Sequence, residues 1–191
     1  MQTRKEPVKN RIVKAALEEF LLAGYANSSM RNIATQSGIT VGNIYSYFSS
    51  KEELFDYILS DTVDELNKLF AMKVEYSESL STESLTSMAR LVSDVFLKYR
   101  IQFLILMDGS AGSKYQDLKS TMIKQACERI LSDAKLQGNS GTAQADHLLA
   151  ESLSLALIEG MIHIFKHSGR NRKRLEALVG DFLAVIIKGF Y

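Results

Sequence analysis

Hydrophobic residues recur at intervals of three and four along most of this chain, which is the spacing of one face of an α-helix. Between Val8 and Ala23, one apolar face is formed by Ile12, Val13, Ala16, Leu17 and Phe20. Gly24 follows where a glycine commonly ends a helix. The alternation of β-branched and polar residues that marks strands is missing, and Pro7 is the only proline. The pattern therefore predicts an all-α fold.

A short helix is expected next. Ser28 and Ser29 are residues that favour a helix start, and Ile33 with Ala34 supplies a short apolar face. Gly38 ends the segment after about two turns. This second helix is therefore too short to be stable without tertiary contacts.

Two further helices begin close behind it. Thr40 can cap a helix from Val41 to about Tyr47. Ser50, followed three residues later by Glu53, forms a capping box for a long helix over about 51–75. We expect the helix at 41–47 to dock on a core formed with the first two helices.

The rest of the chain carries longer helical patterns. The segment YSESLST at 76–82 predicts a loop, and helical patterns follow near 83–111, 116–137, 143–168 and 172–190. We expect about nine helices in all. A three-helix domain would occupy residues 1–50 and a larger helical domain residues 51–191, with the helix at about 51–75 connecting them.

The helix expected at 41–47 has more exposed surface than packing requires. Ile44 and Phe48 lie four residues apart and would anchor it in the core. The other faces are small, polar or aromatic and comprise Gly42, Asn43, Ser46 and Tyr47. A short helix, a glycine-containing turn and a second such helix are typical of a helix-turn-helix, whose second helix enters the major groove of DNA. Helical bundles that bind no nucleic acid also contain such pairs.

Residues 8 to 55 resemble the TetR family of bacterial transcriptional repressors. The run RIVKAALEEFLLAGYANSSMRNIA is similar to the first two helices of that family, and GITVGNIYSYFSSKEEL is similar to its turn, recognition helix and the start of its fourth helix. The resemblance implies a DNA-binding head followed by a helical domain that binds an effector and a second copy of the chain.

The resemblance also implies which side chains contact DNA. Positions that face bases are Val41, Gly42 and Tyr45. Positions that hold phosphates are Asn43, Tyr47 and Lys51, and further contacts come from Ser29, Arg31 and Thr40. Valine departs from the polar or basic residue frequent at its position and offers only an apolar contact, for example to a thymine methyl. Base readout is therefore expected mostly from Arg31 and Tyr45.

Each of these assignments has a simpler alternative. Tyr45 could be a half-buried core tyrosine with its hydroxyl in water, since such residues are common at the edge of a core. Lys51 could belong to a solvated first helical turn. Surface arginines such as Arg31 often make no specific contact.

Two apolar stripes in the C-terminal part suit an interface with a second copy of the chain. They include Leu153, Leu157, Leu175, Leu178, Phe182 and Ile186. One helix-turn-helix contacts few base pairs, so a two-fold homodimer that reads two half-sites is expected. The alternative is that these stripes bury only the core of their own protomer.

A second cluster could line an apolar effector pocket. Its members are Phe96, Tyr99, Phe103, Met107, Tyr115 and Met122. The family resemblance implies that a small molecule there changes the separation of the two DNA-binding heads. Core packing is the alternative for any one of these residues, and the sequence does not identify the effector.

Charge and composition bound the remaining possibilities. The 191 residues carry a net charge of +1, which gives no general attraction to nucleic acid, but the first 51 residues contain seven Lys or Arg and three Glu. Cys127 is the only cysteine, which excludes an internal disulfide. There is no secretory signal and no uninterrupted apolar run of about 18 residues, so a cytoplasmic protein without a membrane partner is expected.

Catalytic and metal-binding patterns are sparse. Glu159, His163 and His167 repeat at intervals of four, a geometry that could bind a divalent metal. A solvated face or interface histidines explain the spacing equally well, so no metal and no cofactor is predicted. No Ser/His/Asp or Cys/His grouping and no phosphate-binding glycine loop is visible, which argues against an enzyme.

These observations favour a dimeric, sequence-specific DNA-binding regulator, most simply a repressor released from a palindromic operator by a small molecule. The alternative is a helical protein-interaction module that retains a helix-turn-helix without using it for DNA.

Overall fold

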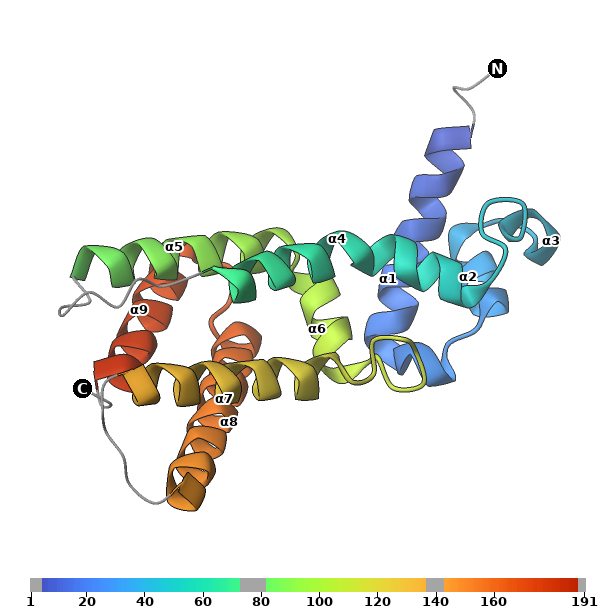
Figure 1. Ribbon diagram of the computed structural model, residues 1–191. Coiled ribbons are helices and arrows are strands. Elements are labelled where there is room, and N and C mark those ends of the chain that lie inside the picture. Colours follow the sequence, from blue (N-terminus) through green and yellow to red (C-terminus); the bar gives the residue numbers. More distant parts are fainter. Residues whose placement is uncertain (1–4, 73–81, 137–142, 189–191) are drawn as a thin grey trace. The chain divides into compact units, whose positions relative to one another are not determined.

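The computed structural model describes residues 5–72, 82–136 and 143–188, and its described part contains nine helices and no strand (Figure 1). The prediction of an all-α fold is confirmed. The helices are α1 (Lys5–Asn27), α2 (Met30–Ser37), α3 (Val41–Ile44), α4 (Lys51–Ala71), α5 (Thr82–Lys98), α6 (Arg100–Asp108), α7 (Leu118–Leu136), α8 (Ala143–His167) and α9 (Arg172–Lys188).

Several helix boundaries differ from the prediction. The regular helix is interrupted at Gly24 as predicted, because the backbone there (φ 71°, ψ 169°) is not helical, but α1 resumes beyond this kink and ends at Asn27. The single helix expected over 83–111 is two helices, α5 and α6, separated at Tyr99. Periodicity could not show this break, because apolar residues continue at helical spacing on both sides of it. Of the predicted loop, 76–81 lies outside the described residues, and Thr82 begins α5.

The chain divides into two compact units that do not follow a single cut in the sequence. The first unit consists of residues 1–65 and 101–117, and the second of residues 66–100 and 118–191. Helices α4 and α6 therefore contribute residues to both units.

The core of the first unit joins α1, α2, α3 and the beginning of α4. Ile12, Ile33, Ile44 and Leu54 each have no exposed surface. Aromatic rings complete the core: the ring centroids of Phe20 and Phe55 lie 4.8 Å apart in an edge-to-face arrangement, and those of Tyr25 and Phe55 lie 4.7 Å apart. Because all four helices contribute side chains to this one core, α2 and α3 are held against α1.

Residues 101–117 join this unit through a close backbone contact. The Tyr25 N–H donates to the Gly109 carbonyl at 2.7 Å. A Cβ atom on Gly109 would lie 3.3 Å from the Phe20 carbonyl oxygen and 3.4 Å from the Gly24 Cα, so glycine at both positions lets the two backbones approach. Beyond Gly109, the segment returns to α4, where Lys114 pairs with Asp56 at 2.6 Å.

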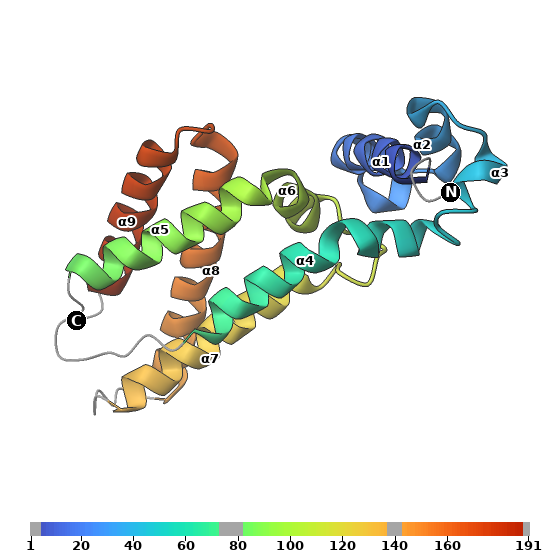
Figure 2. The ribbon, with the colours of Figure 1, turned by 90° about the horizontal axis from the view of Figure 1, so that it is seen from above.

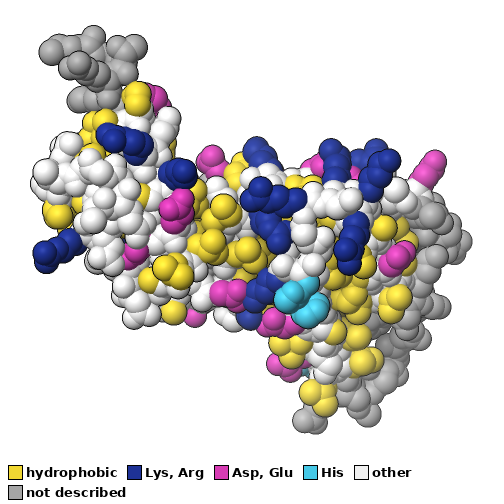
Figure 3. Space-filling view, turned by 180° about the vertical axis from the view of Figure 1, so that it is seen from behind, with side chains coloured by type: hydrophobic (Ala, Val, Ile, Leu, Met, Phe, Trp, Pro, Cys, Tyr) yellow, Lys and Arg dark blue, Asp and Glu magenta, His cyan; other side chains and the backbone are white. Residues whose placement is uncertain are grey.

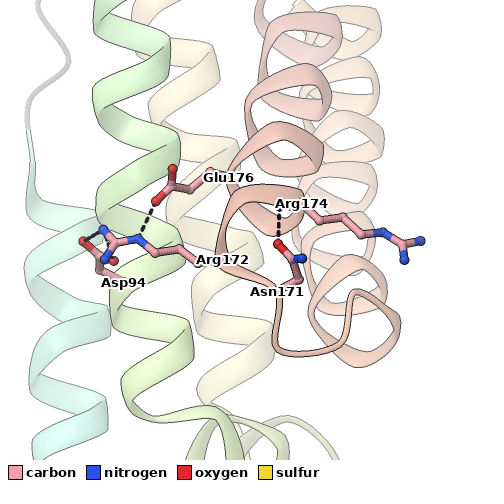
Figure 4. A network of polar contacts seen from close by, with 5 residues as sticks. All are labelled: Asp94, Asn171, Arg172, Arg174 and Glu176. Atoms are coloured by element: carbon pink, nitrogen blue, oxygen red, sulfur yellow. Dashed lines mark hydrogen bonds and ion pairs between the residues drawn. The ribbon is translucent and has the colours of Figure 1, made fainter.

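In the second unit, α5 packs against α9, and α7 packs against α8, which crosses it at a steep angle (Figure 1, Figure 2). Helix α8 also packs on α9, where the ring of Phe182 lies against Gly160. Asn171 caps α9 by accepting a hydrogen bond from the Arg174 N–H at 3.0 Å (Figure 4). Arg172 then links α9 to α5 by pairing with Asp94, and it also pairs with Glu176 within α9 (Figure 4).

Candidate nucleic-acid interface

The ends of α2 are fixed as the sequence predicts. The Ser29 side chain accepts a hydrogen bond from the Asn32 N–H at 3.1 Å, which caps the helix start. Gly38 adopts the left-handed conformation (φ 69°, ψ 35°) at the helix end, where a residue with a Cβ would be strained. The turn that leads into α3 therefore depends on this glycine.

Helix α3 is shorter than predicted. Thr40 caps it as expected, its hydroxyl accepting from the Asn43 N–H at 3.2 Å, but the regular helix ends at Ile44 rather than near Tyr47. The chain continues as a turn, in which the Phe48 N–H donates to the Ile44 carbonyl at 3.1 Å. The register of the side chains is thus kept beyond the helix end.

This register separates a buried face from an exposed one. Ile44 and Phe48 are 0% and 2% exposed, whereas Val41 and Tyr45 are 39% and 49% exposed. A Cβ atom on Gly42 would meet nothing within 4 Å. The face that the sequence predicts for DNA therefore points out of the first unit and has room for another surface to approach closely.

Asn43 is oriented by its neighbour. The Ser46 hydroxyl donates to the Asn43 main-chain oxygen at 2.7 Å and lies 3.3 Å from its side-chain Oδ1. Both side chains are exposed, and Tyr47 next to them is half-buried. With Oδ1 engaged, the Asn43 side-chain N–H groups are the donors that remain for an anion.

Lys51 is held internally. Its ammonium donates to the carbonyl oxygens of Tyr25 at 2.6 Å and Ser28 at 3.0 Å, and it lies 4.3 Å from the centroid of the Tyr25 ring. Partial burial lowers the pKa of this amine. Two of its three N–H donors are thus engaged with the C-terminal end of α1, and the predicted phosphate contact of Lys51 stays a prediction.

Glu19 is a functional candidate that the sequence analysis missed. Its side chain is buried, with 4% exposed, and accepts from the Ser29 N–H at 3.3 Å and from the side-chain amides of Asn32 and Gln36 at 2.9 Å each. The signal in the sequence was its place seven residues after Ile12, on the buried face of α1, where a charged residue needs partners. Glu19 therefore holds one face of α2 against α1 over two turns.

The remaining predicted DNA-contacting residues lie at the surface of the same unit. Arg31 is exposed in the first turn of α2, and its guanidinium forms no hydrogen bond or ion pair with the described residues. Ser29 is half-buried, because its side chain caps α2, and Thr40 is exposed. All nine predicted residues thus lie in the first unit, between Ser29 and Lys51.

The residues predicted for an effector pocket fall in both units. Phe103, Met107 and Tyr115 belong to the first unit, and Phe96, Tyr99 and Met122 to the second. The Tyr115 hydroxyl donates to Asp56, and burial together with this bond raises the pKa of Tyr115. Phe96 stacks on Phe165 at 3.9 Å between ring centroids. Effector binding by this set stays a prediction.

One residue predicted for the dimer interface is corrected by the structure. Leu175 is completely buried inside the second unit and cannot face a second protomer. Leu178 is 38% exposed, and half-buried positions are held by Leu153, Leu157, Phe182 and Ile186. A periodic stripe marks apolar residues but cannot show which of them their own unit covers.

The same two helices expose apolar residues that the prediction did not include. These are Leu148, Leu149 and Leu155 on α8 and Val185 on α9. Hydrophobic side chains lie at the surface between charged ones in the space-filling view (Figure 3). The stretch His147–His167 is long and apolar enough to cross a membrane by length and composition, and only 28% of it is buried. One face of α8 is buried on α7 and α9, and the apolar side chains exposed on its other faces are candidates for contact with another surface.

The possible metal ligands do not assemble in the described part of the chain. Glu159 pairs with Lys119 at 2.6 Å, and the rings of His163 and His167 lie 4.5 Å apart. Among the described residues, no group of three His, Cys, Asp or Glu side chains is placed to hold a metal ion. Cys127 is buried, and burial raises the pKa of its thiol, which is typical of an inert core cysteine.

Comparisons with known proteins match the part of the chain that contains these residues. Residues 12–58 match the family model described as bacterial regulatory proteins, tetR family. The chain is 24% identical over 192 residues to the HTH-type transcriptional regulator UidR of Escherichia coli (strain K12), with 96% of each chain covered. It is 28% identical over 106 residues to the uncharacterized HTH-type transcriptional regulator YfiR of Bacillus subtilis (strain 168), covering 53% of this chain and spanning about half, 52%, of YfiR.

A solved structure shares the fold. It is the TetR family transcriptional regulator PfmR from Thermus thermophilus, which matches with a TM-score of 0.60 and 20% identity over 95% of this chain and 99% of PfmR. The helical region that follows the helix-turn-helix is therefore of the same fold as in that regulator.

Proposed function

The chain belongs to the TetR family of bacterial transcriptional regulators, and on that premise we propose that it is a homodimeric repressor. It binds a palindromic operator in the cytoplasm, blocks a promoter there, and leaves the operator when a small-molecule effector binds. It acts by binding and not by catalysis.

The single observation that carries this proposal is the exposed face of α3. Ile44 and Phe48 fully anchor this short helix, yet Val41, Gly42 and Tyr45 remain open to a partner. A protein that used the helix only for packing would have no reason to leave a glycine and two large side chains together at its surface. A major groove about 12 Å wide admits such a helix.

The proposed contacts follow from the chemistry of each side chain. Arg31 and Tyr45 read base edges by hydrogen bonds, and Val41 contacts a thymine methyl. Asn43 and Tyr47 donate to phosphates, with Ser29 and Thr40 close to the backbone. These contacts place the protein in register on the duplex and give it sequence preference.

Dimerisation is supported by the apolar surface of α8 and α9. Leu155 and Leu178 are 43% and 38% exposed, and water contact with such a surface is unfavourable. A two-fold copy that covers it presents two α3 helices to two half-sites about one helical turn apart. The dimer thereby reads about twice as many base pairs as one helix-turn-helix does.

Effector control is proposed from the chain's place in the TetR family. A small molecule favours one of two conformations of a protein only to the extent that its affinities for the two differ. The operator affinity then changes by the same coupling free energy.

Selection of bound fragments from the source genome, followed by footprinting, tests the DNA-binding part of this proposal. We expect two protected half-sites related by a dyad, and binding that weakens steeply as salt rises. Gly42→Glu provides the specific control, because its side chain meets nothing in the protein and would place a carboxylate against the DNA. Unchanged circular dichroism with loss of the footprint supports the proposal; an intact footprint in this variant overturns it.

A further inference from the structure

Three cations of the first unit, Lys9, Lys51 and Lys114, have partners within the unit. The Lys9 ammonium lies 4.0 Å from the centroid of the Tyr57 ring, and Lys114 pairs with Asp56 at 2.6 Å. Lys51 bonds to two carbonyl oxygens. A DNA-binding face needs positive groups that are free to meet phosphates, so the cations left without such partners are of interest.

The position of Lys51 fits a structural task. It is the first residue of α4, and its two acceptors, Tyr25 and Ser28, lie at the C-terminal end of α1, where carbonyl groups carry the negative end of the helix dipole. Ser28 directly precedes Ser29, which caps α2. Lys51 therefore holds the connection between α1 and α2 in place.

Arg11 is the cation that lies beside the helix-turn-helix turn. One nitrogen of its guanidinium, Nη1, is 3.8 Å from the point that a Cβ atom on Gly38 would occupy. Gly38 is the left-handed residue between α2 and α3, two residues before the cap of α3. Arg11 is exposed, and its guanidinium forms no hydrogen bond or ion pair with any described residue.

The guanidinium is well suited to a phosphate at this place. It presents planar, forked N–H donors that match two phosphate oxygens, and it stays charged at any physiological pH. When a recognition helix enters the major groove, the turn before it passes close to the sugar-phosphate backbone. A donor beside that turn therefore meets a phosphate that flanks the groove.

We propose that Arg11 binds a DNA phosphate at the turn between α2 and α3, and that Lys51 is a positioning residue without a phosphate of its own. This inference rests on the proposed function, because it takes α3 to be the helix in the groove. It assigns a contact to a residue of α1 that precedes the segment matched by the family model, residues 12–58.

The test is the salt dependence of binding of the full-length protein to its footprinted operator. Removal of one phosphate-binding cation lowers the slope of log K against log salt by about 0.9. Because the dimer carries two Arg11 side chains, Arg11→Ala is expected to lower the slope by about 1.8. Binding is expected to weaken about a hundredfold, at about tenfold for each charged hydrogen bond removed. Lys14→Ala removes an exposed cation one turn further along α1 and serves as the matched control, with an unchanged slope.

Lys51→Met separates the two roles. It keeps an aliphatic chain over Tyr25 but removes the donors, so we expect weaker binding at every salt concentration with the slope of the original protein. If this variant loses its helical circular dichroism, the salt dependence is measured on Lys51→Gln instead, because glutamine keeps a neutral donor. A lowered slope for the Lys51 variant, an unchanged slope for Arg11→Ala, or an equal decrease for Lys14→Ala overturns the inference. If the unaltered protein binds no fragment, the proposed function is wrong, and the inference about Arg11 and Lys51 fails with it.

Discussion

Replacement of Glu19 by alanine probes how the DNA-binding helices are held. The change removes a buried carboxylate that accepts three hydrogen bonds from α2, through Ser29, Asn32 and Gln36. Two of these donors belong to exposed side chains that can turn to water after the change. The third donor is the N–H of Ser29, a half-buried residue, and it loses its partner.

The expected decrease in stability follows from these contacts. A hydrogen bond to a charged group contributes about 1.5–3 kcal/mol, and a buried donor left without a partner costs about as much. Because two donors can be solvated again, we expect the free energy of unfolding to fall by roughly 2–3 kcal/mol and not by the sum of three bonds. In a chain of this length the melting temperature then falls by about 5–10 °C.

Urea unfolding followed by circular dichroism measures this decrease, and operator binding is measured at a temperature where both proteins are folded. Glu18→Ala is the matched control, because it removes an exposed carboxylate from the neighbouring position of the same helix. Glu19→Gln keeps one acceptor oxygen and should recover part of the stability. Equal stabilities for the alanine variants of Glu18 and Glu19 would refute the role assigned to Glu19.

Three further predictions concern packing, association and pH. Gly160→Ala should destabilise the protein by about 1–3 kcal/mol, because its Cβ would lie 2.3 Å from an aromatic carbon of α9. Gly180→Ala meets only ordinary contacts at 3.6 Å and should be neutral or stabilising in thermal melts. Leu178→Lys should shift the protein from dimer to monomer in sedimentation, whereas Leu22→Lys, at a position 87% exposed in the first unit, should not; a dimer in both variants would count against the proposed interface. Asp56 has a pKa below its ordinary value, chiefly through its hydrogen bond with a lysine, so its contribution is present above the unfolded-state pKa and is lost as pH falls through the folded-state pKa. In acid titrations followed by circular dichroism, the original protein should lose a small part of its stability below about pH 4. Asp56→Asn, which has no carboxylate to protonate at this position, should not show that loss.

The sequence alone determined the local structure of the DNA-binding head. The caps at Ser29 and Thr40, the left-handed Gly38 and the buried pair Ile44 and Phe48 were all readable, because each depends on residues within one or two helical turns. The capping box was only half right: the Glu53 N–H bonds to the Ser50 hydroxyl, but the Glu53 carboxylate accepts from Ser49. The TetR-type motif was recognisable for the same local reason.

The tertiary structure decided which polar and apolar side chains are free. Lys51 meets carbonyl groups 23 and 26 residues away, and Glu19 reaches residues up to 17 positions distant, so neither role follows from neighbouring residues. Leu175 and Leu178 belong to one periodic stripe, yet only the first is completely buried. Helical periodicity fixes the direction of a side chain about its own axis, but what occupies that direction depends on elements that are distant in the sequence.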